Sequence, residues 1–311
     1  MPETPKMMFS DTSRLGRPFA KDPVVVRFGG RYLMYYSIPP YAPELKPKNG
    51  PEGLNIGIAE SQDLYNWRKI GEIVPGQECD RTGLGAPGAI VLDGKLHLFY
   101  QTYGTGKHDA ICHAVSTDGV DFTRDPSNPV FHPTGDWTCG RAIDADVIEH
   151  EGRLLMLCAT RDPEMKRQML VAAAAPLNSA FSRKDWVQLC DAPVLKPELS
   201  WEQDCIEAPA LCRRGKDLFL FYAGAYNNAP QQIGCATSTD GVHWTRLSKE
   251  PFLANGKPGE WNSSESGHPG LFTDEDGRTY LFYQGNNDHG RTWLLSCVEV
   301  EWDKGRPILA R

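Results

Sequence analysis

The chain has 311 residues, of which 40% are hydrophobic and 23% charged, a composition typical of a folded protein with an apolar core. Its formal net charge of −7 argues against a basic surface for nucleic acid. No stretch approaches the roughly 18 uninterrupted apolar residues of a membrane span. The segment 1–10 lacks the basic and apolar regions of a signal peptide, so we expect a cytoplasmic protein without membrane contact.

Nine cysteines occur, none of them in a CxxC pair. This usage is typical of free thiols that serve as small core residues in a reducing compartment, and it argues against a disulfide framework or a zinc site. The 30 glycines and 24 prolines, with hardly any long window of helical period, predict many short strands and turns.

One pattern recurs along the whole chain: a short apolar strand, a turn with glycine, and an aromatic-rich strand. The five copies lie at 22–37, 86–101, 144–159, 207–223 and 268–284. A second strand pair follows each copy, marked in three of them by an SxD turn, so each repeat predicts a four-stranded antiparallel sheet. Five such sheets predict an all-β fold, a five-bladed β-propeller around a central channel, as one domain over 1–311. A β-sandwich would not explain five equivalent units.

The first strand of each blade lines the channel, so equivalent positions of the five copies converge on the axis. Counting eight residues back from the turn glycine, or nine in the fifth copy with its longer turn, gives the axial positions Asp22, Ala86, Asp144, Glu207 and His268. Three carboxylates and a histidine gathered at one point disfavour one another's charged forms, which costs stability. Their convergence therefore indicates chemistry or a bound cation.

Three carboxylates around a small pocket fit glycoside hydrolysis, in which one acid protonates the leaving oxygen and another carboxylate activates water. Asp22, pinned by Pro23, suits a fixed base, whereas Glu207 has the longer reach of an acid at the pocket rim. We expect a raised pKa for Glu207, because Asp144 adds a like charge. Asp146 points to the same strand face as Asp144 and competes with it for this role.

Four motifs occur in blade order: DP at 22–23, AIDADV at 142–147, EAP at 207–209 and GH at 267–268. In these motifs the chain resembles glycoside hydrolase family 43 or a close relative among the five-bladed propeller glycosidases of families 32, 43, 62, 68 and 117. The resemblance implies an inverting enzyme, exo-acting on arabinofuranosyl, xylosyl or related units of plant or algal oligosaccharides.

The resemblance also implies a role for each matching residue. Asp22 would be the general base, Glu207 the general acid, and Asp144 the residue that orients the acid and raises its pKa. His268 would lie near a calcium ion in the central channel, and Arg291, in a final GR segment, would contact the sugar. No organic cofactor is implied.

Aromatic side chains stack on the C–H faces of sugars, so loop aromatics are candidates for the pocket rim, with packing inside the fold as the alternative. The candidates are Tyr41, Trp137, Trp201 and Trp261. Two other functions stay open: a noncatalytic carbohydrate-binding propeller with a central calcium, and a hydrolase of neoagarooligosaccharides like those of family 117. Phosphorolysis needs a basic pocket, and Arg141, Arg161 and Arg291 are too scattered in sequence to support one.

Overall fold

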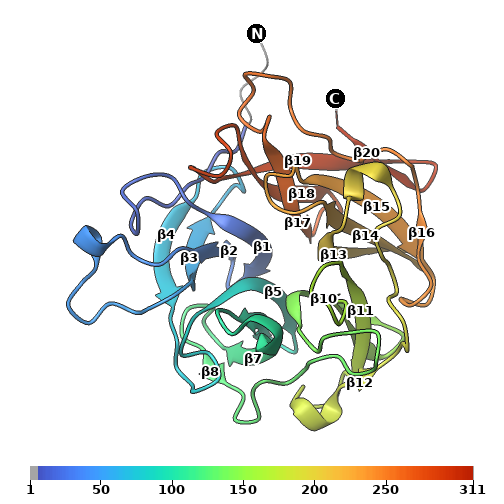
Figure 1. The fold of residues 1–311 in the computed structure, drawn as a ribbon, viewed down its shortest axis with the longest axis horizontal. Helices are drawn as coiled ribbons and strands as arrows, with labels where there is room; N and C mark the ends of the chain where they lie inside the picture. The colour runs from blue at the N-terminus through green and yellow to red at the C-terminus, as the bar shows by residue number, and fades with distance from the viewer. Residues whose placement is uncertain (1–5, 311) are drawn as a thin grey trace.

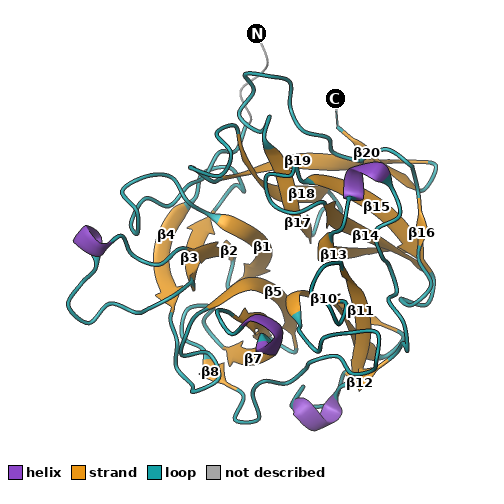
Figure 2. Ribbon diagram, viewed as in Figure 1, coloured by secondary structure: helices purple, strands orange, loops and turns teal. Residues whose placement is uncertain are grey.

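The computed structural model describes residues 6–310, in which twenty strands form five four-stranded antiparallel sheets (Figure 1). The sheets stand around a common centre, and the strand order within each sheet follows the chain (Figure 2). The prediction of a five-bladed β-propeller is therefore confirmed.

The blades have the following strands. Blade one comprises β1 (Lys21–Phe28), β2 (Arg31–Ile38), β3 (Asn55–Ser61) and β4 (Arg68–Ile73). Blade two comprises β5 (Leu84–Leu92), β6 (Lys95–Thr102), β7 (Ile111–Ser116) and β8 (Thr123–Arg124). Blade three comprises β9 (Ile143–His150), β10 (Arg153–Arg161), β11 (Gln168–Pro176) and β12 (Val187–Gln188). Blade four comprises β13 (Ile206–Arg214), β14 (Asp217–Gly224), β15 (Gln232–Ser238) and β16 (Thr245–Arg246). Blade five comprises β17 (Glu265–Thr273), β18 (Thr279–Asn286), β19 (Leu294–Asp303) and β20 (Arg306–Leu309).

Helical structure in residues 6–310 is limited to four short 3₁₀ turns, at Pro43–Leu45, Gly106–His108, Arg183–Asp185 and Ser200–Glu202. Within the same residues, no helix combines the length and the hydropathy that a membrane crossing requires. All nine cysteines are free thiols, as the sequence predicts.

The inner strands form a closed ring, because each contacts the inner strand of the next blade and β17 contacts β1. A segment before blade one strengthens this closure. Phe9 and Leu295 of β19 exchange two backbone hydrogen bonds of 2.8 Å, and buried Met7 lies beside them. Blade five is thereby joined directly to the start of the chain.

The apolar core is divided into five clusters, one between each pair of neighbouring blades. Phe99 of blade two and Val147 of blade three share one cluster, and Phe221 of blade four and Leu281 of blade five share another. Because the hydrophobic contacts lie between the blades, the axis of the ring remains available for polar side chains.

Each inner strand carries a bulge near its N-terminal end, at a residue with positive φ. These five residues are Asp22, Ala86, Asp144, Ala208 and His268, with φ between 41° and 54°. Side chains other than glycine rarely adopt this conformation, and bulges re-aim side chains next to functional sites. The repetition in all five blades makes the bulge a feature of the fold.

The bulges correct one prediction, because Ala208, not Glu207, is the equivalent of Asp22. Glu207 pairs with Ala223 in the regular ladder before the bulge, as Lys21 pairs with Ser37 in blade one. The miscount arises in the β13–β14 turn. Its glycine, Gly215, is the first residue of the two-residue turn, whereas the glycine is the second residue in blades two and three.

Candidate functional site

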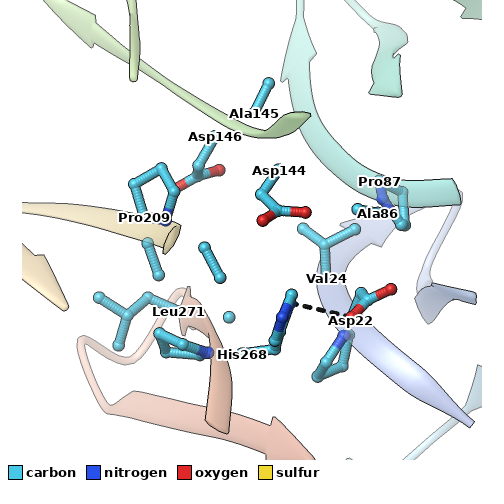
Figure 3. A pocket seen from close by; sticks show the side chains of 15 residues that line it. Asp22, Val24, Ala86, Pro87, Asp144, Ala145, Asp146, Pro209, His268 and Leu271 are labelled. Atoms are coloured by element: carbon cyan, nitrogen blue, oxygen red, sulfur yellow. Dashed lines mark ion pairs between the residues drawn. The ribbon is translucent and has the colours of Figure 1, made fainter. Parts of the chain in front are cut away.

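The N-terminal ends of the inner strands surround a cavity of about 270 Å³ on the propeller axis. Asp22, Asp144, Glu207 and His268 all line it, so the four ionisable residues predicted at the axis are brought together. A channel of about 30 Å³ continues further along the inner strands (Figure 3). The cavity therefore narrows sharply on its inner side.

His268 lies between two carboxylates. Its Nδ1 is 2.9 Å from Asp22 Oδ1, the contact drawn in Figure 3, and its Nε2 is 3.1 Å from Glu207 Oε1. Asp22 and Glu207 therefore lie on two sides of one imidazole ring.

Glu207 accepts hydrogen bonds on both carboxylate oxygens. Gln231 donates to Oε1 at 2.7 Å, His268 contacts the same oxygen, and the Gln168 amide donates to Oε2. Burial opposes ionisation of Glu207, but the hydrogen bond and positive charge of His268 outweigh it and lower its pKa. The expectation of a raised pKa for Glu207 is therefore wrong for the pocket without substrate.

Asp144, and not Glu207, is the carboxyl group whose pKa is raised. Burial raises the pKa of Asp144 to about 7; the charge of His268 opposes this rise, and the charges of Glu207 and Asp22 add to it. Its Oδ2 is buried and has no hydrogen-bond partner in the described chain. Side-chain ligand atoms of Asp144, Glu207 and His268 all lie within 4.8 Å of one another. The two carboxyl groups therefore lie close together, and Asp144 is the one whose pKa is raised.

Asp22 is ionised, as a general base must be. Burial opposes its charge, but the positive charges of His268 and Lys21 hold its pKa well below the usual range. In return, Asp22 outweighs the burial of His268 and raises the pKa of the imidazole well above its ordinary value. Asp22 and His268 thus form a buried ion pair beside Glu207.

Asp146 does not face the cavity. It lines the narrower channel, where its Oδ2 accepts a hydrogen bond of 2.6 Å from the backbone N–H of Leu211 in blade four. Burial raises its pKa to about 7. Asp146 joins blades three and four through this bond, and of the two aspartates only Asp144 lines the cavity that holds Asp22 and Glu207.

Two of the predicted rim aromatics are packed inside blades. Trp201 stacks on Tyr222 with ring centroids 6.0 Å apart, and a Cβ at Gly224 would overlap its ring. Trp261 lies against Gly285 in the same manner. Neither tryptophan lines the cavity that holds the carboxylates, so sugar contact by either one stays a prediction. Both fill space that a strand glycine leaves open.

The other predicted substrate contacts also lie away from the cavity lining. Trp137 packs against the cluster between blades two and three, and the Tyr41 ring lies 3.9 Å below the Arg14 guanidinium. Arg291 is exposed, and its backbone carbonyl accepts a hydrogen bond from Arg17. The GR segment therefore does not bring an arginine to the cavity described here.

Asp144, Glu207 and His268 form a buried group that could hold a metal ion. The unpartnered Oδ2 of Asp144 favours a cation. Calcium, however, takes about six to eight oxygen ligands, and this group offers two carboxylates. Both nitrogens of His268 already contact carboxylates. The protein groups alone do not fit calcium, so no catalytic step is derived through it.

Other cavity residues were not singled out from the sequence as axial. Lys21 occupies the register position of Glu207, and Arg141 and Arg161 both line the cavity beside Gln168. The two arginines, judged too scattered in sequence, are thus brought together by the fold. Only Lys21, which directly precedes Asp22, had a sequence signal that register counting could have used.

A set of hydrogen bonds from second strands holds the bulges. Gln284 of β18 accepts a hydrogen bond from the backbone N–H of Asp22 at 3.2 Å, and Gln101 of β6 accepts one from Asp144 at 2.8 Å. Both glutamines end the sequence FYQ in their repeats. The FYQ tripeptide is therefore a sequence signal for the glutamines that hold the backbone of the two aspartates.

The sequence model of glycosyl hydrolases family 43 matches residues 15–307. The chain belongs to this family. The chain is therefore a member of a family of glycosyl hydrolases.

Individual proteins are similar to the chain in sequence or in fold. A probable sucrose-6-phosphate hydrolase of Psychromonas ingrahamii is 31% identical over 149 residues, covering 44% of this chain and 25% of that protein. The chain thus matches about a quarter of the length of this relative. A thermostable family-43 glycoside hydrolase has a TM-score of 0.73 at 18% identity, covering 94% of this chain and 93% of the other. An alpha-L-arabinofuranosidase from Lactobacillus brevis has a TM-score of 0.67 at 20% identity, covering 93% and 94%. At these identities the solved structures show the fold.

Proposed function

We propose that this family 43 member is an inverting glycosidase that removes single arabinofuranosyl, xylosyl or related units from the ends of plant or algal oligosaccharides. The observation that carries the proposal is the placement of Asp22 and Glu207 on opposite sides of His268 in one cavity. The narrowing of the cavity on its inner side supports exo action, because such a pocket accommodates a chain end better than a chain passing through.

In this proposal Asp22 accepts a proton from water, whose oxygen attacks the anomeric carbon as the glycosidic C–O bond breaks. Glu207 donates a proton to the leaving oxygen. Since the pKa of Asp144 is raised and that of Glu207 is lowered, Asp144 in this scheme passes a proton to Glu207 before or during bond cleavage. Asp144 then supplies the acid with its proton, and Asp144 and Glu207 titrate as a coupled pair.

The names of similar proteins guide the choice of substrates. The structural neighbour from Lactobacillus brevis is an arabinofuranosidase, which supports testing arabinofuranosides first. The relative from Psychromonas ingrahamii supports adding sucrose and sucrose 6-phosphate to the panel. Neoagarooligosaccharides test the alternative suggested by the family 117 pattern. The nine free thiols support a cytoplasmic setting, in which short oligosaccharides are the expected substrates.

The roles of the two carboxylates are tested by varying the leaving group. We expect Glu207→Gln to lose about 10²–10⁴-fold in kcat on substrates with poor leaving groups, because protonation of the leaving oxygen is lost. The loss in kcat should be smaller on a dinitrophenyl glycoside, because dinitrophenolate departs without being protonated. Asp22→Asn should lose a similar factor on both substrates. A Glu207→Gln loss independent of the leaving group would contradict its assignment as the acid.

The alternative of a noncatalytic propeller with a structural calcium makes the opposite prediction. In that case chelator would lower the melting temperature, and no glycan of the panel would be hydrolysed. The metal-binding group at the axis argues against this alternative. It offers two carboxylates and an imidazole whose two nitrogens already contact carboxylates.

A further inference from the structure

Three cationic side chains line the cavity that holds the candidate carboxylates: Lys21, Arg141 and Arg161. The chain as a whole has a formal net charge of −7, so its composition does not explain why three cations lie in one cavity. A pocket that binds only neutral sugars needs hydrogen-bonding groups, but it does not need a cluster of permanent positive charges.

Arg161 is held in place but is not neutralised. Its Nε donates to Gln168 Oε1 at 2.8 Å, one Nη donates to the Met165 carbonyl at 3.4 Å, and its guanidinium lies 5.2 Å above the Tyr226 ring. No carboxylate of residues 6–310 lies within ion-pair distance of it, and its second Nη donates to no protein group in that range. A fixed guanidinium with a free N–H edge is suited to bind an oxyanion.

Arg141 shares a hydrogen-bond acceptor, Gln168, with Arg161. Its guanidinium pairs with buried Asp109 at 3.3 Å and donates to Gln168 Oε1 at 3.5 Å. The oxygen of Gln168 thus receives donors from both arginines, while its amide nitrogen donates to Glu207. One glutamine therefore places the arginines directly beside the candidate acid.

Lys21 provides a second charge without a carboxylate partner within ion-pair distance in the described chain. Its ammonium lies 4.5 Å from the centre of the Trp293 ring. The side chain leaves β1 at the register position that Glu207 occupies in β13. Lys21 and Arg161 thus carry positive charge into the cavity from blade one and blade three.

From this arrangement we propose that the substrate carries an anionic group, a carboxylate or a phosphate, which Arg161 binds with Arg141 and Lys21 close by. The proposal rests on the proposed function, since it names the class of glycoside that the same cavity accepts. The acidic residues of the cavity serve the chemistry, and Arg161 selects the anionic substituent.

Binding is tested by calorimetry without turnover, so the result does not depend on glycosidase activity. The probes are glucuronate, glucose 6-phosphate and inorganic phosphate, with glucose as the neutral match. We expect at least one of the anions to bind more tightly than glucose, with an affinity that falls as salt rises. Arg161→Met should weaken that binding about ten- to hundredfold, as the loss of a charge-assisted hydrogen bond predicts. Exposed Arg213→Met is the matched control and should bind like the wild type.

The probe that binds most tightly shows which anionic group the substrate carries. Preference for glucuronate supports a uronic acid substrate, and preference for either phosphate compound supports a phosphorylated substrate. Binding of glucose as tight as that of the anions, failure of all three anions to bind, or unchanged anion binding in Arg161→Met would overturn the proposal. Release of a sugar 1-phosphate when phosphate is added to an active assay would also overturn it, because the cations would then serve a phosphate nucleophile. If no neutral glycoside is hydrolysed but the anions bind, the anion site stands and the neutral substrate assignment fails.

Discussion

At the scale of single residues, the site consists of groups that set one another's charge. His268 lies between Asp22 and Glu207 and stabilises both as carboxylates, whereas buried Asp144 has an oxygen without a partner and takes the proton. Residue type alone favours Glu207 as the protonated group. The contacts with Gln168, Gln231 and His268 reverse this, and they depend on side chains from three blades.

The raised pKa of Asp144 predicts a stability change with pH. Its pKa lies near 3.8 in an unfolded chain and about 7 in the folded protein, so the folded state binds more protons between these values. Folding stability therefore falls as pH rises through this window, by about 1.4 kcal/mol per unit of pKa difference. Asp144→Asn removes this loss, and its melting temperature should exceed that of the wild type at pH 8.

The difference between Asp144→Asn and the wild type should shrink toward pH 4, where the wild-type carboxyl is also neutral. Asp146 contributes the same pH dependence to both proteins and cancels in the comparison. Melting curves of both proteins across this pH range make the measurement. A variant that is equally destabilised at pH 4 and pH 8 would show that Asp144 is not held protonated by the fold.

At the scale of secondary structure, the site depends on how closely the inner strands approach. A Cβ built at Gly270 of β17 would overlap the backbone carbonyl of Pro23, next to Asp22. Gly270→Ala should therefore push β17 from β1, destabilise the fold by about 1–3 kcal/mol as overpacking does, and lower kcat with it. Gly71→Ala is the control, since its Cβ would meet Ile58 and Val120 at 3.6 and 3.7 Å. Equal stability of the two variants would contradict this close approach.

The same scale shows what the sequence predicts well. The alternation of apolar strand, glycine turn and aromatic strand predicts the hairpins, because the two strands of a hairpin are neighbours in the sequence. The position of Gly215 within its turn shifts the register by one, so Glu207 is found at the axis but not at the bulge. The packing of Trp201 and Trp261 against strand glycines could not be predicted, because a loop tryptophan has the same local pattern whether it meets a sugar or a glycine.

At the scale of the whole molecule, the ring brings together residues that are far apart in the chain. Arg141 and Arg161 line one cavity with Glu207 because blades three and four are neighbours, and no local pattern predicts that proximity. The five clusters between blades supply the stability, which leaves the axis free for buried charge.

The central claim is that Asp22 and Glu207 act across one cavity as the base and acid of an inverting hydrolysis. Proton NMR of the sugar first released from a hydrolysed glycoside tests it most directly, before the anomers interconvert in water. The account predicts that the first-formed anomer has the configuration opposite to that of the substrate. A product that first appears with the substrate's own configuration would contradict it, because retention requires a covalent intermediate on a carboxylate.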